Sequence, residues 1–446
     1  MRPFNIVFRA ARPASLSTFL ILCATNARGT PSVGEEANES LTALDRASTI
    51  RIALARSPSL EAGAHRARAI KEAARAEGRL PPPQAMVWAW QIPISRPYAV
   101  NDAGMVMVGV QQEFPAPGAA SFRRDAKTNE AAVEQAMTSD KARQIARDAD
   151  HAFSDYVEAT ARHRIHVAHF DIARRLYTVT QARHGAGGSL ADATQAEAEL
   201  ARVQADVVTD AARVQTARAR INALLVRPPS SNLAPPVEAE PTVPASTVDE
   251  ILKSAYQNRP ELRVASADRA AKDAELAARH REATWPSFNV AALYFAPTGP
   301  SPTHGYGVNA GMSLPWVWGP FDARQSAQKE LVASADKDIE AARITIQAEV
   351  VTSDANGRSA ALRLQILRDK VLPATKRALD VALSGYESSR TELTAVLNAR
   401  KAVIETEMDL LMSRSSLDHA LADLDAAVGK TVPRAPLGPY QEPGGR

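Results

Sequence analysis

Two heptad repeats in the same register, half a chain apart, constrain the fold of this chain more than any other feature. Val396 lies 203 positions after Ala193, and the same offset separates each later pair. The apolar positions are Ala193, Leu200, Val207, Val214 and Ile221 in the first repeat and Val396, Val403, Leu410, Leu417 and Leu424 in the second. The companion positions three residues after the first set are apolar except Asp210. A sustained heptad predicts a long helix packed on other helices, and its recurrence indicates an internal duplication.

The composition fits closely packed helices. Only 5% of the 446 residues are aromatic, and Ala, Arg, Glu and Asp dominate long stretches. The net charge is +3 with acids and bases interspersed, so the chain lacks the basic patch of a nucleic-acid-binding protein.

Residues 1–27 are predicted to form a signal peptide. Arg2, Arg9 and Arg12 precede a short apolar run at 16–22, and Ala27 offers a small-residue cleavage site. A membrane anchor is the alternative, but the run is far below the ~20 residues that a span needs. Cys23, the only cysteine, follows Leu22 where a lipoprotein signal needs a small residue, so ordinary cleavage is favoured over lipidation. No other segment is apolar enough for a transmembrane helix, so a mature membrane protein would have to span by β-strands.

The first structural repeat is predicted over residues 40–230. A helical pattern over 41–79 contains Pro58, which allows either two helices or one kinked helix. Strands follow at about 84–92 and 105–114, and helices at about 121–184 and 189–227, with Ser189 as a candidate N-cap. At 1.5 Å per residue, the longer helix would extend ~95 Å.

The second structural repeat is predicted over residues 248–431, after a Pro-rich connector at 228–247. It has a helix over 248–281, strands at about 287–295 and 306–314, and helices at about 320–385 and 389–428. Residues 432–446 form a polar tail. The two copies align locally, because Arg56-Ser57-Pro58-Ser59-Leu60 matches Asn258-Arg259-Pro260-Glu261-Leu262, 202 positions later.

The predicted strands alternate between large apolar side chains and small or polar ones. On the first strand we assign Met86, Trp88 and Trp90 to the large apolar face. On the second, Val106, Val108, Val110, Gln112 and Phe114 alternate with Met107, Gly109, Gln111 and Glu113. On the last strand, Tyr306, Val308, Ala310, Met312 and Leu314 alternate with Gly307, Asn309, Gly311 and Ser313. Such hairpins suit a wall with lipid on one face and a wet lumen on the other, although a hairpin on a soluble core has the same pattern. Four strands cannot close a membrane barrel, whereas three copies would supply twelve.

These features together resemble the TolC family of outer-membrane efflux channels over roughly residues 40–430. Asn258-Arg259-Pro260-Glu261-Leu262 matches the RPEL-type start of the family's second repeat, and the stretch from Gly385 to Leu393 resembles its G-Y-x-x-G turn. Phe114-Pro115-Ala116-Pro117-Gly118 and Leu314-Pro315-Trp316-Val317-Trp318-Gly319 resemble strand-to-helix junctions of its cation-efflux branch. The resemblance implies a mainly α protein with a membrane β-barrel, in which a trimer forms a 12-stranded barrel and a long α-helical coiled-coil tunnel.

The resemblance also implies a function and partners. The chain would be a homotrimer in the outer membrane, in contact with outer-membrane lipid and with its helical tunnel in the periplasm. It would passively conduct substrates delivered by a periplasmic adaptor (membrane fusion) protein and an inner-membrane efflux transporter of the RND type. It would need no cofactor and have no catalytic centre. The cargo is open between metal cations, which the junction motifs suggest, and drugs or other small molecules.

By the same resemblance, the two turns at 184–190 and 386–392 are the candidate entrance. The expected entrance residues are Asp192, Tyr386, Arg390 and Glu392, and the expected adaptor-docking residues are Gly185, Gly187, Gly188, Ser189, Ser388 and Ser389. In the family, carboxylates after these turns form a ring. Only Asp192 matches, because Ala395 and Asn398 hold the corresponding places of the second repeat. Tyr386 and Arg390 are expected to hold a closed entrance through hydrogen bonds.

Three other interpretations fit the sequence less well. His163, His166 and His169 are spaced to share a metal, but three solvent-facing histidines are favoured over a metal site. The sequence contains no H-E-x-x-H motif, nucleophile elbow, phosphate loop or cysteine pair, so an enzyme is disfavoured. The alternative to a channel is a secreted or envelope coiled-coil scaffold without a pore.

Overall fold

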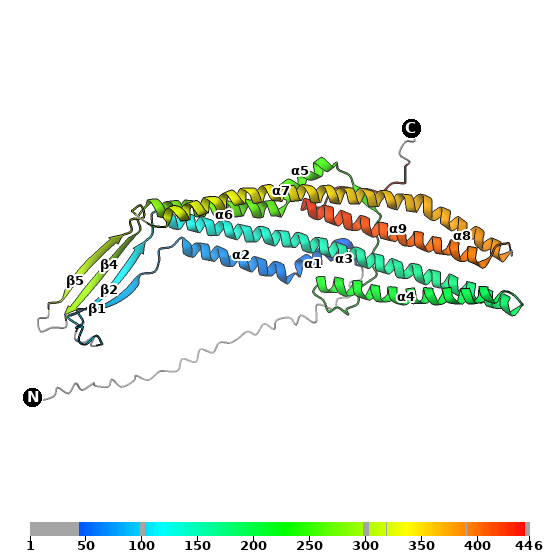
Figure 1. The fold of residues 1–446 in the computed structure, drawn as a ribbon, viewed down its shortest axis with the longest axis horizontal. Helices are drawn as coiled ribbons and strands as arrows, with labels where there is room; N and C mark the ends of the chain where they lie inside the picture. Colours follow the sequence, from blue (N-terminus) through cyan, green and yellow to red (C-terminus); the bar gives the residue numbers. More distant parts are fainter. Residues whose placement is uncertain (1–43, 99–102, 298–302, 318, 389, 442–446) are drawn as a thin grey trace, which may run out of the picture. The chain divides into compact units, whose positions relative to one another are not determined.

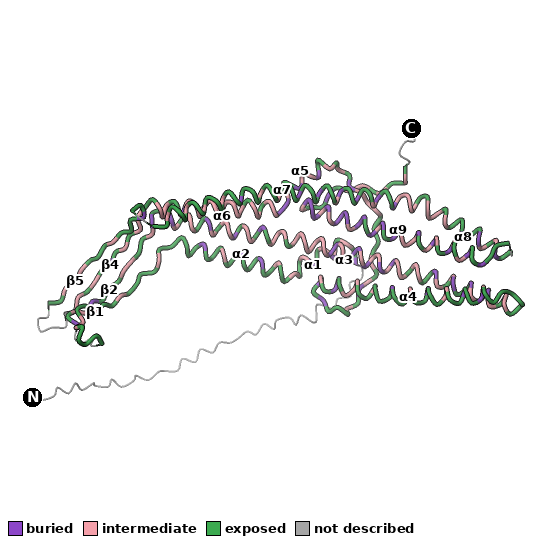
Figure 2. Tube along the Cα trace, viewed as in Figure 1, coloured by how far each residue is buried: buried purple, intermediate pink, exposed green. Residues whose placement is uncertain are grey.

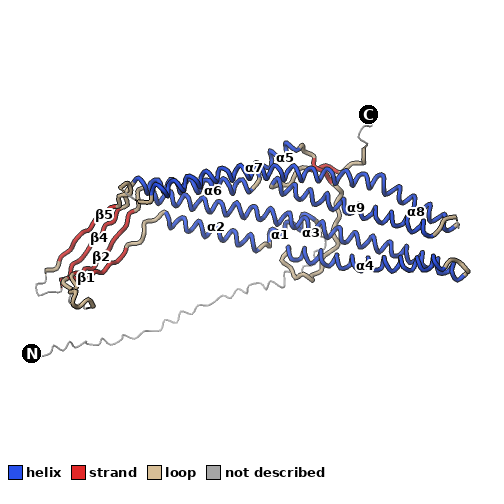
Figure 3. Tube along the Cα trace, viewed as in Figure 1, coloured by secondary structure: helices blue, strands red, loops and turns tan. Residues whose placement is uncertain are grey.

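The computed structural model describes residues 44–98, 103–297, 303–317, 319–388 and 390–441 (Figure 1). The predicted signal peptide and Cys23 therefore lie outside the described residues. The first repeat contains α1 (Arg46–Ala55), α2 (Pro58–Glu77), β1 (Gln84–Trp90), β2 (Met105–Phe114), α3 (Ala119–Gly185) and α4 (Leu190–Leu224). The second contains α5 (Val248–Asn258), α6 (Pro260–Thr284), β4 (Phe288–Pro297), β5 (Gly305–Met312), α7 (Phe321–Ile366), a π-helical turn (Leu367–Val371), α8 (Leu372–Glu387) and α9 (Leu393–Val428). The predicted duplicated order of helices and strands is confirmed (Figure 3).

The long helix α3 is shared between two sets of neighbours. Its N-terminal part packs between α2 and α6, and its C-terminal part packs between α4 and α9. The helix α7 in turn packs on α6 and then on α9. The neighbouring helices are therefore α2–α3–α6–α7 in the part near the strands and α4–α3–α9–α7 in the part near the turns (Figure 1). All the heptad positions predicted for α4 and α9 are buried or half-buried, as a packed seam requires.

Each repeat buries its own core where its short first helix crosses its heptad helix (Figure 2). In the first repeat, Ile221 and Leu225 at the end of α4 pack with residues of α1 and α3. In the second, Leu424 and Val428 at the end of α9 pack with residues of α5 and α7. Leu424 lies 203 positions after Ile221, and Val428 lies 203 positions after Leu225. The duplication therefore extends to the packing of the cores.

Three prolines decide where helices break. Pro58 is the first residue of α2, so the two-helix alternative for 41–79 holds. The single helix expected over 248–281 is wrong, because Pro260 ends α5 and begins α6. The long helix predicted at about 320–385 is observed as a continuous helical segment, α7 to α8, interrupted only in its hydrogen-bond pattern. A π-helical turn at Leu367–Val371 precedes Pro373, whose missing N–H interrupts the hydrogen-bond ladder.

The connector and the tail pair with each other, which the sequence analysis missed. The strand β3 (Thr242–Pro244) lies antiparallel to β6 (Arg434–Pro436). Each strand has only three residues, too few for an alternation to be recognised. The tail is therefore tied to the connector.

The strands β1, β2, β4 and β5 form one antiparallel sheet in the order β1–β2–β4–β5. Residues paired in register lie on the same face of such a sheet. One face, named here the valine–tyrosine face, carries from successive strands Ala85, Val87 and Ala89; Val106, Val108, Val110, Gln112 and Phe114; Phe288, Val290, Ala292, Tyr294 and Ala296; and Tyr306, Val308, Ala310 and Met312. The other, the glycine–asparagine face, includes Gln84, Gln111, Glu113, Asn289, Asn309 and four glycines.

The register corrects the predicted facing of β1. Trp88 pairs with Met107 and Trp90 with Met105, so both tryptophans lie on the glycine–asparagine face. Val87, which pairs with Val108, lies on the valine–tyrosine face. The prediction was wrong because both faces of β1 are apolar, so side-chain size alone could not assign them. The faces predicted for β2 and β5 are those observed.

No helix among the described residues is both long enough and apolar enough to cross a lipid bilayer.

Candidate functional site

The first turn joins α3 to α4 through two glycines that the backbone requires. Gly187 has φ of +92°, a left-handed conformation that favours glycine. Gly188 donates its N–H to the carbonyl of Arg183 at 2.9 Å, and a Cβ on Gly188 would lie 2.8 Å from that oxygen. Ser189 then caps α4 as predicted, because its hydroxyl accepts the N–H of Asp192 at 3.2 Å.

The second turn joins α8 to α9 around the carbonyl of Gly385. The N–H groups of Arg390 and Thr391 donate to it at 2.8 and 3.2 Å. The hydroxyl of Ser388 donates to the carbonyl of Ser384 at 2.9 Å, which satisfies part of the C-terminal turn of α8. A Cβ at position 385 would collide with the hydroxyl of Thr391, so glycine is needed there too.

Arg183 links the two turns. Its guanidinium lies over the ring of Tyr386, 4.3 Å from the ring centroid. It also donates to the carbonyls of Tyr386 at 3.3 Å and Glu387 at 3.4 Å, at the C-terminal end of α8, where the helix dipole favours a cation. Tyr386 is buried among apolar residues of four helices, α3, α4, α8 and α9: Leu176, Ala196, Ala382, Leu393 and Val396. The end of α3 is thus fastened to the end of α8.

An ion pair between a buried arginine and a half-buried glutamate joins α9 to α4 farther from the turns. Arg400 of α9 is 1% exposed, and its Nη2 lies 3.1 Å from Oε1 of Glu199 on α4. Burial lowers the pKa of Arg400, while Glu199 opposes the shift. The contact joins the heptad helix of one repeat to that of the other.

The side chains of the other predicted entrance residues make fewer contacts than Tyr386 does. Asp192 is half-buried in the first turn of α4, and no described side chain forms an ion pair with its carboxylate. Arg390 and Glu392 are exposed. The guanidinium beside Tyr386 belongs to Arg183, and Arg390 contributes its backbone N–H to the second turn. Ser389 lies outside the described residues.

Sequence reasoning missed Arg183, although a signal for it existed. Tyr386 lies 203 positions after Arg183, the offset that relates the two heptad helices. The residues therefore occupy equivalent places in the two copies, and they meet because the turns lie side by side.

The histidines considered as a metal cluster on α3 are divided between neighbouring helices. Nδ1 of His166 lies 2.5 Å from Asp210 of α4, and Nε2 of His169 lies 2.9 Å from Glu407 of α9. Asp210, the polar exception in the heptad, is thereby paired. Among the described residues no group of three or more His, Cys, Asp or Glu side chains is arranged to hold a metal. The expectation that all three face solvent is wrong for His169, which is buried.

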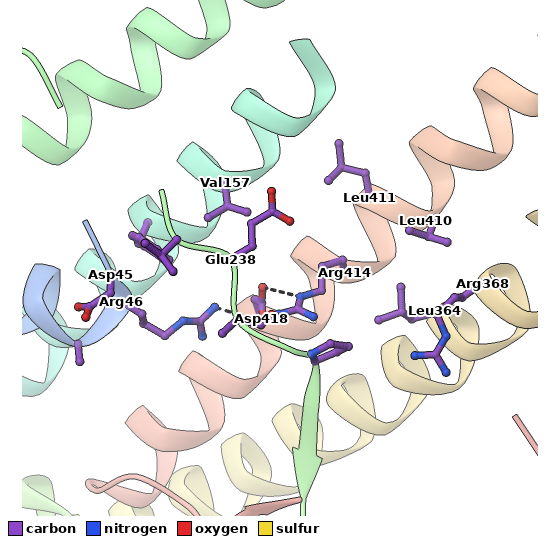
Figure 4. A pocket seen from close by; sticks show the side chains of 15 residues that line it. Asp45, Arg46, Val157, Glu238, Leu364, Arg368, Leu410, Leu411, Arg414 and Asp418 are labelled. Carbon is purple, nitrogen blue, oxygen red and sulfur yellow. Dashed lines mark hydrogen bonds and ion pairs between the residues drawn. The ribbon is translucent and has the colours of Figure 1, made fainter. Parts of the chain in front are cut away.

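A cavity of about 490 Å³ lies between α3, α7 and α9 beneath the connector (Figure 4). Arg46 of α1 and Arg414 of α9 converge on Asp418, at 3.2 and 3.1 Å, and Arg46 also lies 3.1 Å from buried Asp150. Burial raises the pKa of Asp150, and Arg46 opposes the shift. Because these charges neutralise one another, the cavity wall is a structural junction between α1, α3 and α9.

The comparisons with known proteins agree with this architecture. Residues 251–430 match the family model described as outer membrane efflux protein. No curated protein matches the chain. Among solved structures, the outer-membrane channel OprN has a TM-score of 0.72 at 18% identity, with 86% of this chain and 89% of OprN covered.

Two further channels have the same fold. The outer membrane protein VceC from Vibrio cholerae has a TM-score of 0.71 at 16% identity, with 86% of this chain and 96% of VceC covered. The outer membrane channel MtrE from Neisseria gonorrhoeae, in its open state, has a TM-score of 0.70 at 19% identity, with 86% of this chain and 89% of MtrE covered.

Proposed function

Because residues 251–430 match the family model of outer membrane efflux proteins, we propose that this chain is the outer-membrane channel of a tripartite efflux system. It passively conducts substrates out of the cell, and a partner transporter supplies the energy. The observation that carries this proposal is the exposed apolar face of the sheet.

The valine–tyrosine face has the composition of a surface in lipid. Val87, Val108, Tyr294 and Val308, one from each strand, are 70%, 49%, 51% and 73% exposed. Apart from the two tyrosine hydroxyls, Gln112 is the one polar side chain among the paired residues of this face. A soluble protein rarely leaves so continuous an apolar face uncovered, whereas a membrane barrel needs one on its outside. The opposite face, with Gln111, Asn289 and Asn309, suits a wet lumen.

The open edges of the sheet support a trimer. β1 and β5 each have a neighbour on one side only within the described chain. Unpaired strand edges are not tolerated in lipid, so β5 of one copy would pair with β1 of the next. Three copies give twelve strands, enough for a barrel with a lumen. The α-helical layers continue this wall, and the 67 residues of α3 extend ~100 Å.

The two turns would form the periplasmic entrance and its docking surface. In this proposal Asp192, Tyr386, Arg390 and Glu392 surround the entrance, with Arg183 added from the geometry. The turn residues Gly185, Gly187, Gly188, Ser189, Ser388 and Ser389 contact a periplasmic adaptor protein. The inner-membrane transporter, of the RND type, determines whether the cargo is a metal cation or an organic molecule.

Cell fractionation tests the proposal. The full chain, expressed in a Gram-negative host, is expected in the outer membrane, and in detergent as a trimer that dissociates into monomers when the sample is boiled before electrophoresis. A water-soluble, monodisperse monomer would contradict the proposal and would favour the coiled-coil scaffold.

A further inference from the structure

Four histidine–carboxylate contacts join α3 to its neighbours, and three of them lie along its contact with α9. His151 of α3 and His419 of α9 stack with ring centroids 4.5 Å apart and planes 21° apart. Nε2 of His151 lies 3.1 Å from Asp423 of α9, and Nε2 of His419 lies 3.0 Å from Asp155 of α3. Each helix therefore offers one imidazole and one carboxylate, four residues apart, to the other.

The third contact lies closer to the turns. Nε2 of His169 lies 2.9 Å from Oε2 of Glu407, and Lys376 of α8 lies 3.2 Å from the same carboxylate. His169 is 18 positions beyond His151, which is five helical turns or ~27 Å along α3. The contacts are thus spread along the boundary between the two repeats, since α3 belongs to the first and α9 to the second.

We propose that these contacts form a proton-operated clasp between the two repeats. The clasp, defined as His151, Asp155 and His169 of α3 with Glu407, His419 and Asp423 of α9, is closed when the imidazole of His419 is protonated and loosens when that imidazole is neutral. An imidazolium attracts the facing carboxylate, whereas a neutral ring leaves a partly desolvated carboxylate with weaker compensation.

The surrounding charges do not replace the imidazoliums. Arg220 of α4 lies 2.6 Å from Asp155, and Arg147 of α3 acts on Asp423 through its charge. Arg363 of α7 lines the cavity that contains His419 and Asp423 but lies 3.4 Å from Asp409. Arg46 of α1 is engaged by Asp150 and Asp418. Arg46 therefore bridges α3 to α9 through Asp150 and Asp418, the sequence neighbours of the stacked rings, but Asp155 and Asp423 are joined to the opposite helix by the histidines.

The pKa shifts agree with this geometry and set the pH window. The carboxylate of Asp155 raises the pKa of His419, so its stabilisation is complete below ~6.5 and is lost as the pH rises through the raised pKa. Burial alone would raise the pKa of Asp155 and Asp423, but the facing histidines and arginines outweigh it and lower both. His169 lowers the pKa of Glu407. The carboxylate contributions are present above ~4 and are lost as the pH falls through the lowered values. The clasp therefore loosens on the alkaline side of ~6.5.

The consequence for transport rests on the proposed function. The first turn follows α3 and the second precedes α9, so a loosened clasp lets the turns separate. An entrance built on them would open more readily at alkaline than at acidic pH.

The clasp itself can be tested without measuring transport. Nitroxide labels are placed at exposed Val179 of α3 and Lys401 of α9 in a C23S background, and labelled protein is mixed with excess unlabelled protein so that distances within one chain dominate. The distance between the two labels is measured by pulsed electron–electron double resonance at pH 5.5 and 8.5. We expect the distance distribution to be narrow at pH 5.5 and longer and broader at pH 8.5.

Variants separate the clasp from a general effect of pH. The distance distribution of H151Q/H169Q/H419Q is expected to be broad at both pH values. The distribution of H419K, which has a permanent charge beside Asp155, is expected to stay narrow at pH 8.5. The matched control H65Q, on an exposed histidine of α2, is expected to behave as the parent. Identical distributions of the parent at both pH values would overturn the proposal, as would an unchanged pH response in the triple variant. If the triple variant does not fold, the parent and H419K decide. Failure here leaves the outer-membrane location and trimer untouched, because those are measured separately.

Discussion

Arg183 and Tyr386 lie 203 positions apart in the sequence and in contact in the fold, with the guanidinium 4.3 Å from the ring centroid. The contact joins equivalent places of the two repeats. It also joins the two turns, which are otherwise carried by different pairs of helices. In the proposed channel, this contact opposes the separation of the two turns.

Removing the contact is expected to favour the open entrance. The variant R183A loses the cation–π contact and the hydrogen bonds to α8, together worth about 1–2 kcal/mol, so the open-to-closed ratio should rise about five- to thirtyfold. The matched control is R175A, an exposed arginine of the same helix. Single-channel recording measures the ratio, and equal open probabilities for the two variants would show that Arg183 does not hold the entrance.

The assignment of the sheet faces predicts opposite outcomes for neighbouring residues of β5. A lysine at Val308 would place a charge on the valine–tyrosine face, at a cost of ~2–4 kcal/mol if that face meets the centre of the bilayer. A lysine at Asn309 would face the lumen and remain hydrated. We expect V308K to reduce the trimer in the outer membrane severalfold and N309K to leave it near the parental level. The reverse order would contradict the assignment.

Gly185 and Gly188, both at the first turn, should differ in their tolerance of alanine. A Cβ at Gly188 would lie 2.8 Å from the carbonyl oxygen of Arg183, whereas nothing lies within 4 Å of a Cβ at Gly185. G188A is therefore expected to destabilise the turn by about 1 kcal/mol or more, and G185A to be neutral or slightly stabilising. Hydrogen exchange of the amides of residues 184–190 measures this. Equal exchange in both variants would contradict the described turn.

Arg259 should matter for stability although it lies far from both turns. It is buried, donates to the carbonyl of Ala426 at 2.8 Å near the end of α9, and pairs with Glu261 and Glu349. R259L is expected to cost about 2 kcal/mol, less than the ~3–5 kcal/mol of fully buried pairs because both carboxylates are partly exposed. The thermal midpoint should fall by several degrees.

The matched control for R259L is S57A at the equivalent position of the first repeat. Ser57 makes no capping hydrogen bond, so its loss should change stability by less than ~0.5 kcal/mol. A thermal midpoint of R259L equal to that of S57A would show that the arginine does not stabilise the packing of α6, α7 and α9.

Much of the fold could be predicted because it depends on periodicity. The seam from Ala193 to Ile221 and its copy 203 residues later set the long helices and the duplication. Alternation placed the four strands of the main sheet. Local chemistry placed the cap at Ser189.

What could not be predicted depends on pairing between distant segments. Trp88 was assigned to the wrong face because only its register with Met107 decides the matter. Arg183 was missed because its partner lies on the other turn. His166 and His169 were read as one cluster on a helix, but α4 and α9 supply their separate partners, Asp210 and Glu407.

The most direct test of the central claim is the conductance of the purified protein in planar lipid bilayers. We predict stepwise current increases as trimers insert, with larger or longer openings for R183A. Detergent-purified trimer that inserts into the bilayer, yet raises the current above the protein-free level neither as the parent nor as R183A, would contradict the account.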